Sequence, residues 1–156
     1  SSAARVELML GDARESVRYL AAHYDFIFLD GFTPDTNPEL WTIDFLSKLK
    51  DRLKPDGLLA SYCGAFPFKG ALLKLGFHLY ESKPFGRRKG GTVAALDANP
   101  VLPPLPEKEI LIATKSTAGT PYRDPLLRWS REEILRDRVE HVAALRTRGM
   151  PKWYKN

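Results

Sequence analysis

The sequence predicts an α/β protein with a mostly parallel sheet and an antiparallel terminal strand, covered by helices on both faces. Short apolar runs typical of strands alternate with segments of helical period through residues 1–96. The run from Phe26 to Leu29 is continuous rather than alternating, which indicates a strand buried on both faces. The apolar run 91–96 follows the run 77–82 after a short loop, so we expect it to return antiparallel to its predecessor.

The first elements follow from apolar runs and from the turn residues between them. Residues 6–10 predict a short strand that ends at Gly11 and Asp12. Residues 13–22 predict a helix, and residues 25–29 predict the next strand of the sheet.

The loop after this strand leads into a helix with good start signals. Asn37 is expected as the N-cap, with Pro38 at the first helical position and Glu39 in the first turn. Apolar residues then recur at helical spacing as far as Leu53, and the turn residues 54–57 end the helix.

One more strand and one short helix precede the terminal strand pair. Residues 58–63 predict a strand and residues 65–68 a loop. Residues 69–75 predict a helix, for which Gly76 provides the expected C-terminal cap.

The composition changes after residue 96. Residues 97–106 contain four prolines and predict an extended connector. Residues 107–115 fit a strand or a helix, and the glutamates that follow Pro106 favour the helix. Ser130 and Glu133 have the spacing of a capping box, which opens a helix that runs to about residue 146. The predicted organisation is a main α/β part at 1–96, a proline-rich connector at 97–130, and a C-terminal helix and tail at 131–156.

Length and composition restrict the class of protein. The 156 residues suffice for one core, and the 44% hydrophobic and 28% charged content is that of a globular protein. No apolar run reaches the length of a membrane span, and because the first residues show no basic-then-apolar pattern, we expect no leader. The single cysteine, Cys63, and three scattered histidines give no metal-site spacing, so we expect no metal and a cytoplasmic protein.

The charge balance favours a polyanionic partner. The net charge is +5 and the isoelectric point is near 9.4. Basic residues concentrate at 83–89 and 123–148, whereas the first half of the chain is nearly balanced. On charge alone, a solvated basic face remains the alternative to nucleic-acid binding.

Asp30 stands where the strand 25–29 ends. In open α/β sheets, ligands bind beyond the carboxyl ends of the strands, so this carboxylate is placed where chemistry usually occurs. The alternative is a structural role, in which Asp30 only caps the turn before the next helix.

Several separate motifs carry a resemblance to a known family. In sequence order they are LGDAR at 10–14, LDGFTP at 29–34, NPELW at 37–41, LKPDGLLA at 53–60 and FGRR at 85–88. Over residues 6–95 they resemble the MnmC-type tRNA methyltransferases. Residues 115–140, which include TPYRDP, are similar to the C-terminal extension of stand-alone members without a fused oxidase domain.

The resemblance implies a fold, a cofactor and a substrate. The fold would be a Rossmann-like S-adenosylmethionine-dependent methyltransferase, and the partner would be tRNA. The reaction would transfer a methyl group to the amine of 5-aminomethyl-2-thiouridine at the wobble position.

The resemblance also implies site residues. Asp30 would orient the amine and accept its proton, or would contact the amino group of the cofactor's methionine part. Gly11, Asp12 and Ala13 would contact the cofactor through the adenine, although Asp12 also suits a helix N-cap. Phe32 would flank the acceptor base or pack under its loop. The remaining substrate contacts would come from Phe85, Gly86, Arg87 and Arg88, for which a solvated turn is the alternative.

The chain also departs from the family pattern. No G-x-G turn precedes Gly11, so we expect the N-terminal cofactor-loop half to be absent and the chain to be an inactive C-terminal part. The sheet edge left open would favour a homo-oligomer. Residues 65–68 and 90–92 also differ from the family, which leaves a methyltransferase for another amine as an alternative. A non-catalytic basic RNA-binding or assembly module is the alternative from a different class.

Overall fold

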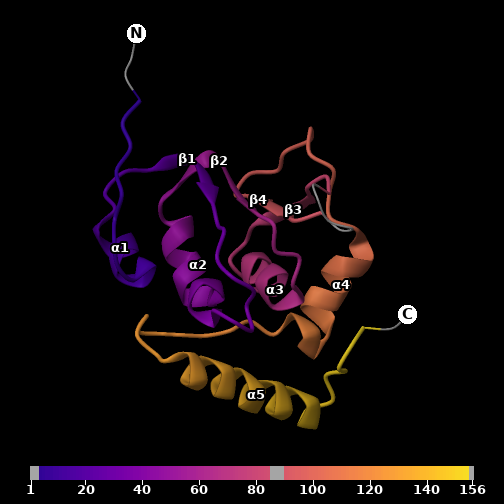
Figure 1. Cartoon of the computed structure of the whole chain (residues 1–156). Helices are drawn as coiled ribbons and strands as arrows, with labels where there is room; N and C mark the ends of the chain where they lie inside the picture. Colours follow the sequence, from indigo (N-terminus) through magenta and orange to yellow (C-terminus); the bar gives the residue numbers. More distant parts are fainter. Residues whose placement is uncertain (1–3, 85–89, 155–156) are drawn as a thin grey trace.

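The computed structural model describes residues 4–84 and 90–154 as a four-stranded sheet with helices packed against it (Figure 1). The elements in chain order are α1 (Ala13–Tyr19), β1 (Tyr24–Phe28), the 3-10 helix η1 (Pro38–Trp41), α2 (Ile43–Lys50), β2 (Leu53–Ser61), α3 (Phe66–Lys74), β3 (His78–Glu81), β4 (Thr92–Ala95), α4 (Glu107–Lys115), the 3-10 helix η2 (Thr117–Gly119) and α5 (Arg131–Thr147).

The strands of the described chain lie in the order β1-β2-β4-β3. Strand β1 pairs with β2 in parallel, and β4 pairs antiparallel with both β2 and β3. Three of these four described strands therefore run in one direction and β4 runs against them. The predicted α/β class, with a mostly parallel sheet and an antiparallel terminal strand, is confirmed.

The core lies between the sheet and the helices α2 and α3. Trp41, Leu46, Leu59, Phe68 and Leu72 are fully buried there. Figure 1 shows α2 and α3 side by side next to the sheet, with α5 running below the lower ends of these helices, where it contacts η1 and η2. Through the buried Ile134, α5 adds the C-terminal segment to the same core.

The helix starts are determined by local side-chain contacts. Asn37 occupies the N-cap position of η1, as predicted, although its side chain makes no cap bond. The helix α2 starts separately, and Thr42 caps it by accepting a hydrogen bond from the Phe45 N–H. Pro38 begins only the short 3-10 helix η1. In contrast, Ser130 and Glu133 form the predicted capping box of α5.

Other predicted boundaries hold in part. Residues 107–115 form the helix α4, as favoured, and β3 and β4 pair antiparallel as expected. Strand β2 begins at Leu53, so residues 54–57 lie inside the strand, next to a bulge opposite Tyr24. Helix α3 begins at Phe66, within the stretch expected to be a loop.

Residues 6–10 do not form the predicted strand. Val6, Leu8 and Leu10 are exposed, and no strand of the described chain pairs with this segment. A strand is stable only when its backbone N–H and C=O groups find partners, which explains why the apolar pattern alone was insufficient here.

Strand β1 is open on one face, contrary to the prediction that it is covered on both. The side chains of Phe26 and Phe28 are 53% and 76% exposed, and their rings stack with centroids 5.7 Å apart. The outer edge of β1 also has no partner strand among the described residues.

The other edge of the sheet is covered. The proline-rich connector runs beside β3, where the Glu81 N–H donates to the Pro103 carbonyl and the Leu105 N–H donates to the Leu79 carbonyl, both at 3.0 Å. Within residues 4–84 and 90–154, no helix is long and apolar enough to cross a membrane.

Candidate active site

Asp30 lies beyond the carboxyl end of β1, at the rim of a hollow of about 310 Å³. The preceding residue, Leu29, is buried, and its N–H donates to the Ala60 carbonyl of β2, which fixes the end of the strand. Ser61 and Tyr62 at the end of β2 line the same hollow, together with Ser82 after β3. The exposed carboxylate thus faces a space bordered by polar groups from three strand ends.

Two aromatic side chains hold the turn that follows Asp30. The Tyr62 hydroxyl donates a hydrogen bond to the Gly31 carbonyl. Trp41 is fully buried, and its indole N–H donates to the Phe32 carbonyl at 2.7 Å. Trp41 also packs edge-on against Phe68 at 5.0 Å. The backbone of the turn is therefore fixed from the core, while the Phe32 side chain is 75% exposed and available for contact.

The far end of this loop is held by the C-terminal segment. The Tyr122 hydroxyl donates to an Asp35 carboxylate oxygen at 3.0 Å, and Arg131 donates to the Asp35 carbonyl at 3.0 Å. Burial raises the pKa of Tyr122 to about 12, so its hydroxyl remains a donor at every physiological pH. Residues far along the sequence thus position the loop that carries Asp30.

Asp12 acts as the N-cap of α1, which confirms the structural alternative. One carboxylate oxygen accepts from the Arg14 N–H at 2.8 Å, and the other pairs with the Arg14 guanidinium at 2.8 Å. The hydrogen bond from the Arg14 side chain lowers the pKa of Asp12. Gly11 before it has a φ of +131°, a conformation that favours glycine.

Asp12 and Asp30 fit the donor groups of S-adenosylmethionine. Ionised carboxylates accept hydrogen bonds from amino and hydroxyl groups, and the side chain of Asp12 is still 41% exposed despite its pairing with Arg14. Its cap role therefore leaves an oxygen surface for a ligand, so both interpretations of Asp12 are compatible with the geometry.

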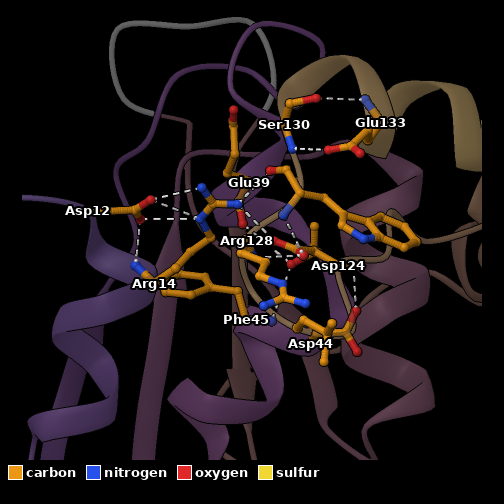
Figure 2. Close-up of polar contacts among 12 residues, drawn as sticks. Asp12, Arg14, Glu39, Asp44, Phe45, Asp124, Arg128, Ser130 and Glu133 are labelled. Carbon is orange, nitrogen blue, oxygen red and sulfur yellow. Dashed lines mark hydrogen bonds and ion pairs between the residues drawn. The ribbon is translucent and has the colours of Figure 1, made fainter.

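Arg14 connects this turn to the C-terminal segment (Figure 2). Its guanidinium bridges Asp12 and the fully buried Asp124, with 2.8 Å to an oxygen of each, and also donates to the Trp129 carbonyl. Asp124 further accepts from the Arg128 and Trp129 N–H groups, and its own N–H donates to Asp44.

A second cavity of about 550 Å³ adjoins the hollow beside Asp30 and shares Tyr62 and Ser82 with it. Lys69 and Glu109 line this cavity as an ion pair, and the Lys69 ammonium also lies 5.5 Å from the centre of the Phe66 ring. The hollow next to Asp30 therefore borders a larger, partly charged cavity.

The predicted site residues have different outcomes. Asp30 and Phe32 lie together at the strand end, whereas Gly11, Asp12 and Ala13 lie at the start of α1. Phe85, Gly86, Arg87 and Arg88 lie outside the described residues. Trp41 and Cys63 are buried in the core. Within the described ranges, no three His, Cys, Asp or Glu side chains gather in a way that could hold a metal ion.

Sequence reasoning missed the contributions of Tyr122, Asp124 and Arg131. These residues hold the Asp30 loop and the Asp12 turn across 87 to 110 positions of sequence. The signal that pointed to Tyr122 and Asp124 was the TPYRDP motif, through its similarity to the family's C-terminal extension, whereas Arg131 lies outside this motif.

Comparison with known proteins gives consistent similarities. An uncharacterized protein of Methanocaldococcus jannaschii is 33% identical over 141 residues, which are 90% of this chain and 40% of that protein. The tRNA 5-methylaminomethyl-2-thiouridine biosynthesis bifunctional protein MnmC of Ralstonia nicotianae is 32% identical over 119 residues, covering 72% of this chain and 18% of that protein. A crystal structure of MnmC2 from Aquifex aeolicus matches with a TM-score of 0.79 and 38% identity, covering 87% of this chain and 44% of that one.

The chain thus spans less than half the length of each of these relatives. A family described as S-adenosyl-L-methionine-dependent methyltransferase matches residues 1–97, a stretch that includes Asp12, Asp30 and the hollow between the strand ends. This match covers more than half of the sequence, so the chain belongs to the S-adenosyl-L-methionine-dependent methyltransferase family.

Proposed function

We propose that the full-length protein transfers a methyl group from S-adenosylmethionine to the amine of 5-aminomethyl-2-thiouridine at the tRNA wobble position. The observation that carries this proposal is the exposed carboxylate of Asp30 on a fixed turn at the strand end. Similarity to the MnmC proteins, whose names specify tRNA 5-methylaminomethyl-2-thiouridine biosynthesis, supports the substrate.

The cofactor would be held by two turns in the first third of the family-matched region, one at residues 11–13 and the other at Asp30. When bound, S-adenosylmethionine supplies an electrophilic methyl group. The Asp12 carboxylate would accept from its adenine amino group, and the turn at Gly11 and Ala13 would let the ring approach the backbone. Asp30 would accept from the amino group of the methionine part or from the substrate amine.

Asp30 contributes orientation and proton transfer. An amine attacks only when its lone pair is free and in line with the methyl group, so the enzyme must align the nitrogen and remove its proton. A carboxylate within hydrogen-bond reach of the nitrogen does both, and it stabilises the positive charge that develops. Tyr62 and Trp41 contribute indirectly, because they fix the backbone of the turn that carries Asp30.

The substrate would contact the surface around this carboxylate. Phe32 is exposed beside Asp30, and a nucleobase stacks well on an aromatic face. Arg87 and Arg88, in the sequence segment between β3 and β4, would contact tRNA phosphates, with Phe85 and Gly86 beside them.

The 156-residue chain alone should bind S-adenosylmethionine weakly and be inactive. The hollow beside Asp30 is bordered by the exposed Phe28, on the face of β1 that is open to solvent. An open site leaves the cofactor partly hydrated and weakens every polar contact in it. Micromolar binding of S-adenosylmethionine to this chain in a calorimetric titration would contradict this part of the proposal.

The decisive experiment uses the full-length protein of the same gene. It is incubated with labelled S-adenosylmethionine and tRNA that carries wobble 5-aminomethyl-2-thiouridine, alongside Asp30→Asn. We expect the variant to lose about 10²- to 10⁴-fold in rate, the usual contribution of a general base. Asp51→Asn is the matched control, because Asp51 is an exposed carboxylate at the C-terminal end of α2.

The outcomes separate the substrate from the site. If the wild type binds the cofactor but transfers no methyl group to this tRNA, the substrate is wrong and other amines must be tested. If Asp30→Asn works as fast as Asp51→Asn, then Asp30 has no role in the reaction. Binding of tRNA without cofactor binding would favour the non-catalytic RNA-binding alternative.

A further inference from the structure

A third cavity, of about 370 Å³, lies between the Asp30 loop, the start of α3 and the C-terminal segment. Asp35 of that loop lines it, and Phe66 lines both this cavity and the 550 Å³ cavity. The hollow beside Asp30 shares Tyr62 and Ser82 with the 550 Å³ cavity, which shares Phe66 with this one, so the three spaces are neighbours.

One side of this cavity is basic. Arg138 and Arg146 of α5 and Lys152 of the tail line it. The two arginines are eight residues apart, which places them on one face of the helix. The Arg138 Nε donates to the Thr120 carbonyl at 2.8 Å, and the Arg146 Nε lies 3.4 Å from the Thr117 hydroxyl.

These cations are not neutralised by ion pairs. In the part of the chain that the structure describes, none of Arg138, Arg146 and Lys152 forms an ion pair with a carboxylate. The carboxylate that lines the cavity, Asp35, accepts a hydrogen bond from Tyr122 instead. The cavity therefore carries a net positive charge with donor groups left for an anion.

Aromatic rings stand beside these cations. Trp153 is 45% exposed and packs edge-on against Phe66, with ring centroids 5.0 Å apart. The Arg138 guanidinium lies 4.9 Å from the centre of the Tyr122 ring, which holds it in place over an aromatic face. Rings next to cations that lack ion pairs are the combination that single-stranded nucleic acids require.

We propose that this cavity binds one nucleotide of the RNA substrate that flanks the acceptor nucleoside. Arg146 and Lys152, supported by Arg138, hold its phosphate, and Trp153 stacks on its base. The inference rests on the proposed function for the identity of the polymer as RNA. The family match ends at residue 97, and Arg138, Arg146, Lys152 and Trp153 lie beyond it. The C-terminal segment would therefore add a substrate contact outside the family-matched region.

The test measures RNA binding by the full-length protein. Fluorescence anisotropy with an unmodified tRNA transcript compares the wild type with the double variant Arg146→Gln/Lys152→Gln across a range of salt concentrations. The expected result is binding weakened about tenfold or more, with a salt slope reduced by about 0.7 per lost phosphate contact. The matched control is Arg136→Gln/Lys108→Gln, which removes two exposed cations on α5 and α4 that do not line the cavity.

A second pair of variants tests stacking. Trp153→Ala should weaken binding about tenfold, whereas Trp153→Tyr should retain most of the affinity because tyrosine also stacks. Cofactor binding by calorimetry and the thermal midpoint should be unchanged in all variants, which shows that the fold is intact. Equal competition by poly-glutamate and by an RNA oligonucleotide would reveal a general anion site and overturn the nucleotide assignment.

The outcomes distinguish this inference from the proposed function. RNA binding that depends on the cavity residues, without methyl transfer to the wobble nucleoside, supports the cavity and rejects the proposed reaction. Methyl transfer by wild-type protein, combined with RNA binding that is the same in the cavity variants and in the control, overturns the cavity assignment.

Discussion

At the scale of single residues, Arg14 shows how one side chain can join distant parts of the sequence. Its guanidinium pairs with Asp12, two residues earlier in the sequence. It also contacts the Asp124 carboxylate and the Trp129 carbonyl, more than a hundred positions later. Asp124 is fully buried and carries a charge that the interior tolerates only because these partners surround it.

We predict that Arg14→Ala lowers the free energy of unfolding by about 3 to 5 kcal/mol, the usual cost of leaving one member of a buried ion pair alone. Urea unfolding of the purified chain, followed by circular dichroism, measures this cost. Arg5→Ala is the control, because its pair with Glu7 is exposed and should contribute less than about 1 kcal/mol. Equal effects of the two substitutions would show that the Asp124 environment does not depend on Arg14.

His141 of α5 provides a prediction about pH. Its Nδ1 is buried and has no hydrogen-bond partner in the described chain, and burial together with the charge of Arg123 and Lys74 lowers its pKa below the ordinary 6.5. The unfolded chain therefore binds more protons than the folded one at pH values below about 6.5, so the His141 contribution destabilises the fold as the pH falls through this range.

Urea unfolding of wild type and His141→Gln at a series of pH values between 8 and about 5 tests this sign. The difference in stability between the two proteins should shift in favour of the variant as the pH falls. A difference that stays constant over this range would mean that His141 titrates alike in the folded and unfolded states.

At the scale of elements, the loop after β1 is held from two sides. Tyr62 and Trp41 fix its first residues from the sheet and the core, and Tyr122 and Arg131 fix Asp35 from the C-terminal segment. This arrangement gives the segment beyond residue 97 a direct mechanical link to the loop that carries Asp30.

We predict that Tyr122→Phe in the full-length protein raises the activation free energy of methyl transfer by more than it lowers the free energy of unfolding. The lost hydrogen bond to Asp35 should cost only about 1 kcal/mol in the free energy of unfolding, because the ring stays packed. Looser positioning of the Asp30 loop, by contrast, could cost up to about 10²-fold in rate. Steady-state kinetics and urea unfolding of the same protein measure the two effects, and an unchanged rate would contradict the link.

The elements also show which parts of the structure the sequence could predict. Signals contained in a few neighbouring residues succeeded: the capping box of α5, the helix start after Pro106 and the antiparallel return of β4. Predictions that depended on distant neighbours were less successful. Residues 6–10 have no partner strand within residues 4–84 and 90–154, and the continuous apolar pattern of β1 does not reveal that one of its faces is open.

In the candidate site too, local sequence signals were sufficient for some residues and not for those positioned by distant contacts. Asp30 and Asp12 could be found because each stands where a short apolar run ends, a pattern that a few neighbouring residues contain. Their anchors, Tyr122, Arg131 and Asp124, lie on a segment whose position depends on tertiary packing. No local periodicity encodes such a pairing, so only the resemblance of TPYRDP to a family extension drew attention to it.

At the scale of the whole molecule, the two edges of the sheet differ in their protection. The connector covers β3, whereas β1 has an edge that no described strand pairs with and a face with two stacked phenylalanine rings. Natural proteins rarely leave such an edge and such an apolar face in water, because both favour association with another chain.

We therefore predict that the 156-residue chain self-associates through β1 at micromolar concentrations, and that Phe26→Ser/Phe28→Ser weakens this association at least about tenfold. The reason is the apolar area removed from the interface, since burying one phenylalanine contributes about 1.5 to 3 kcal/mol. Sedimentation equilibrium of both proteins provides the measurement. Val101→Ser/Val139→Ser is the control, because these residues are exposed on the connector and on α5, away from β1. If the control weakens association as much as the β1 variant does, the interface lies elsewhere on the molecule, and the open face of β1 must then be stable in water.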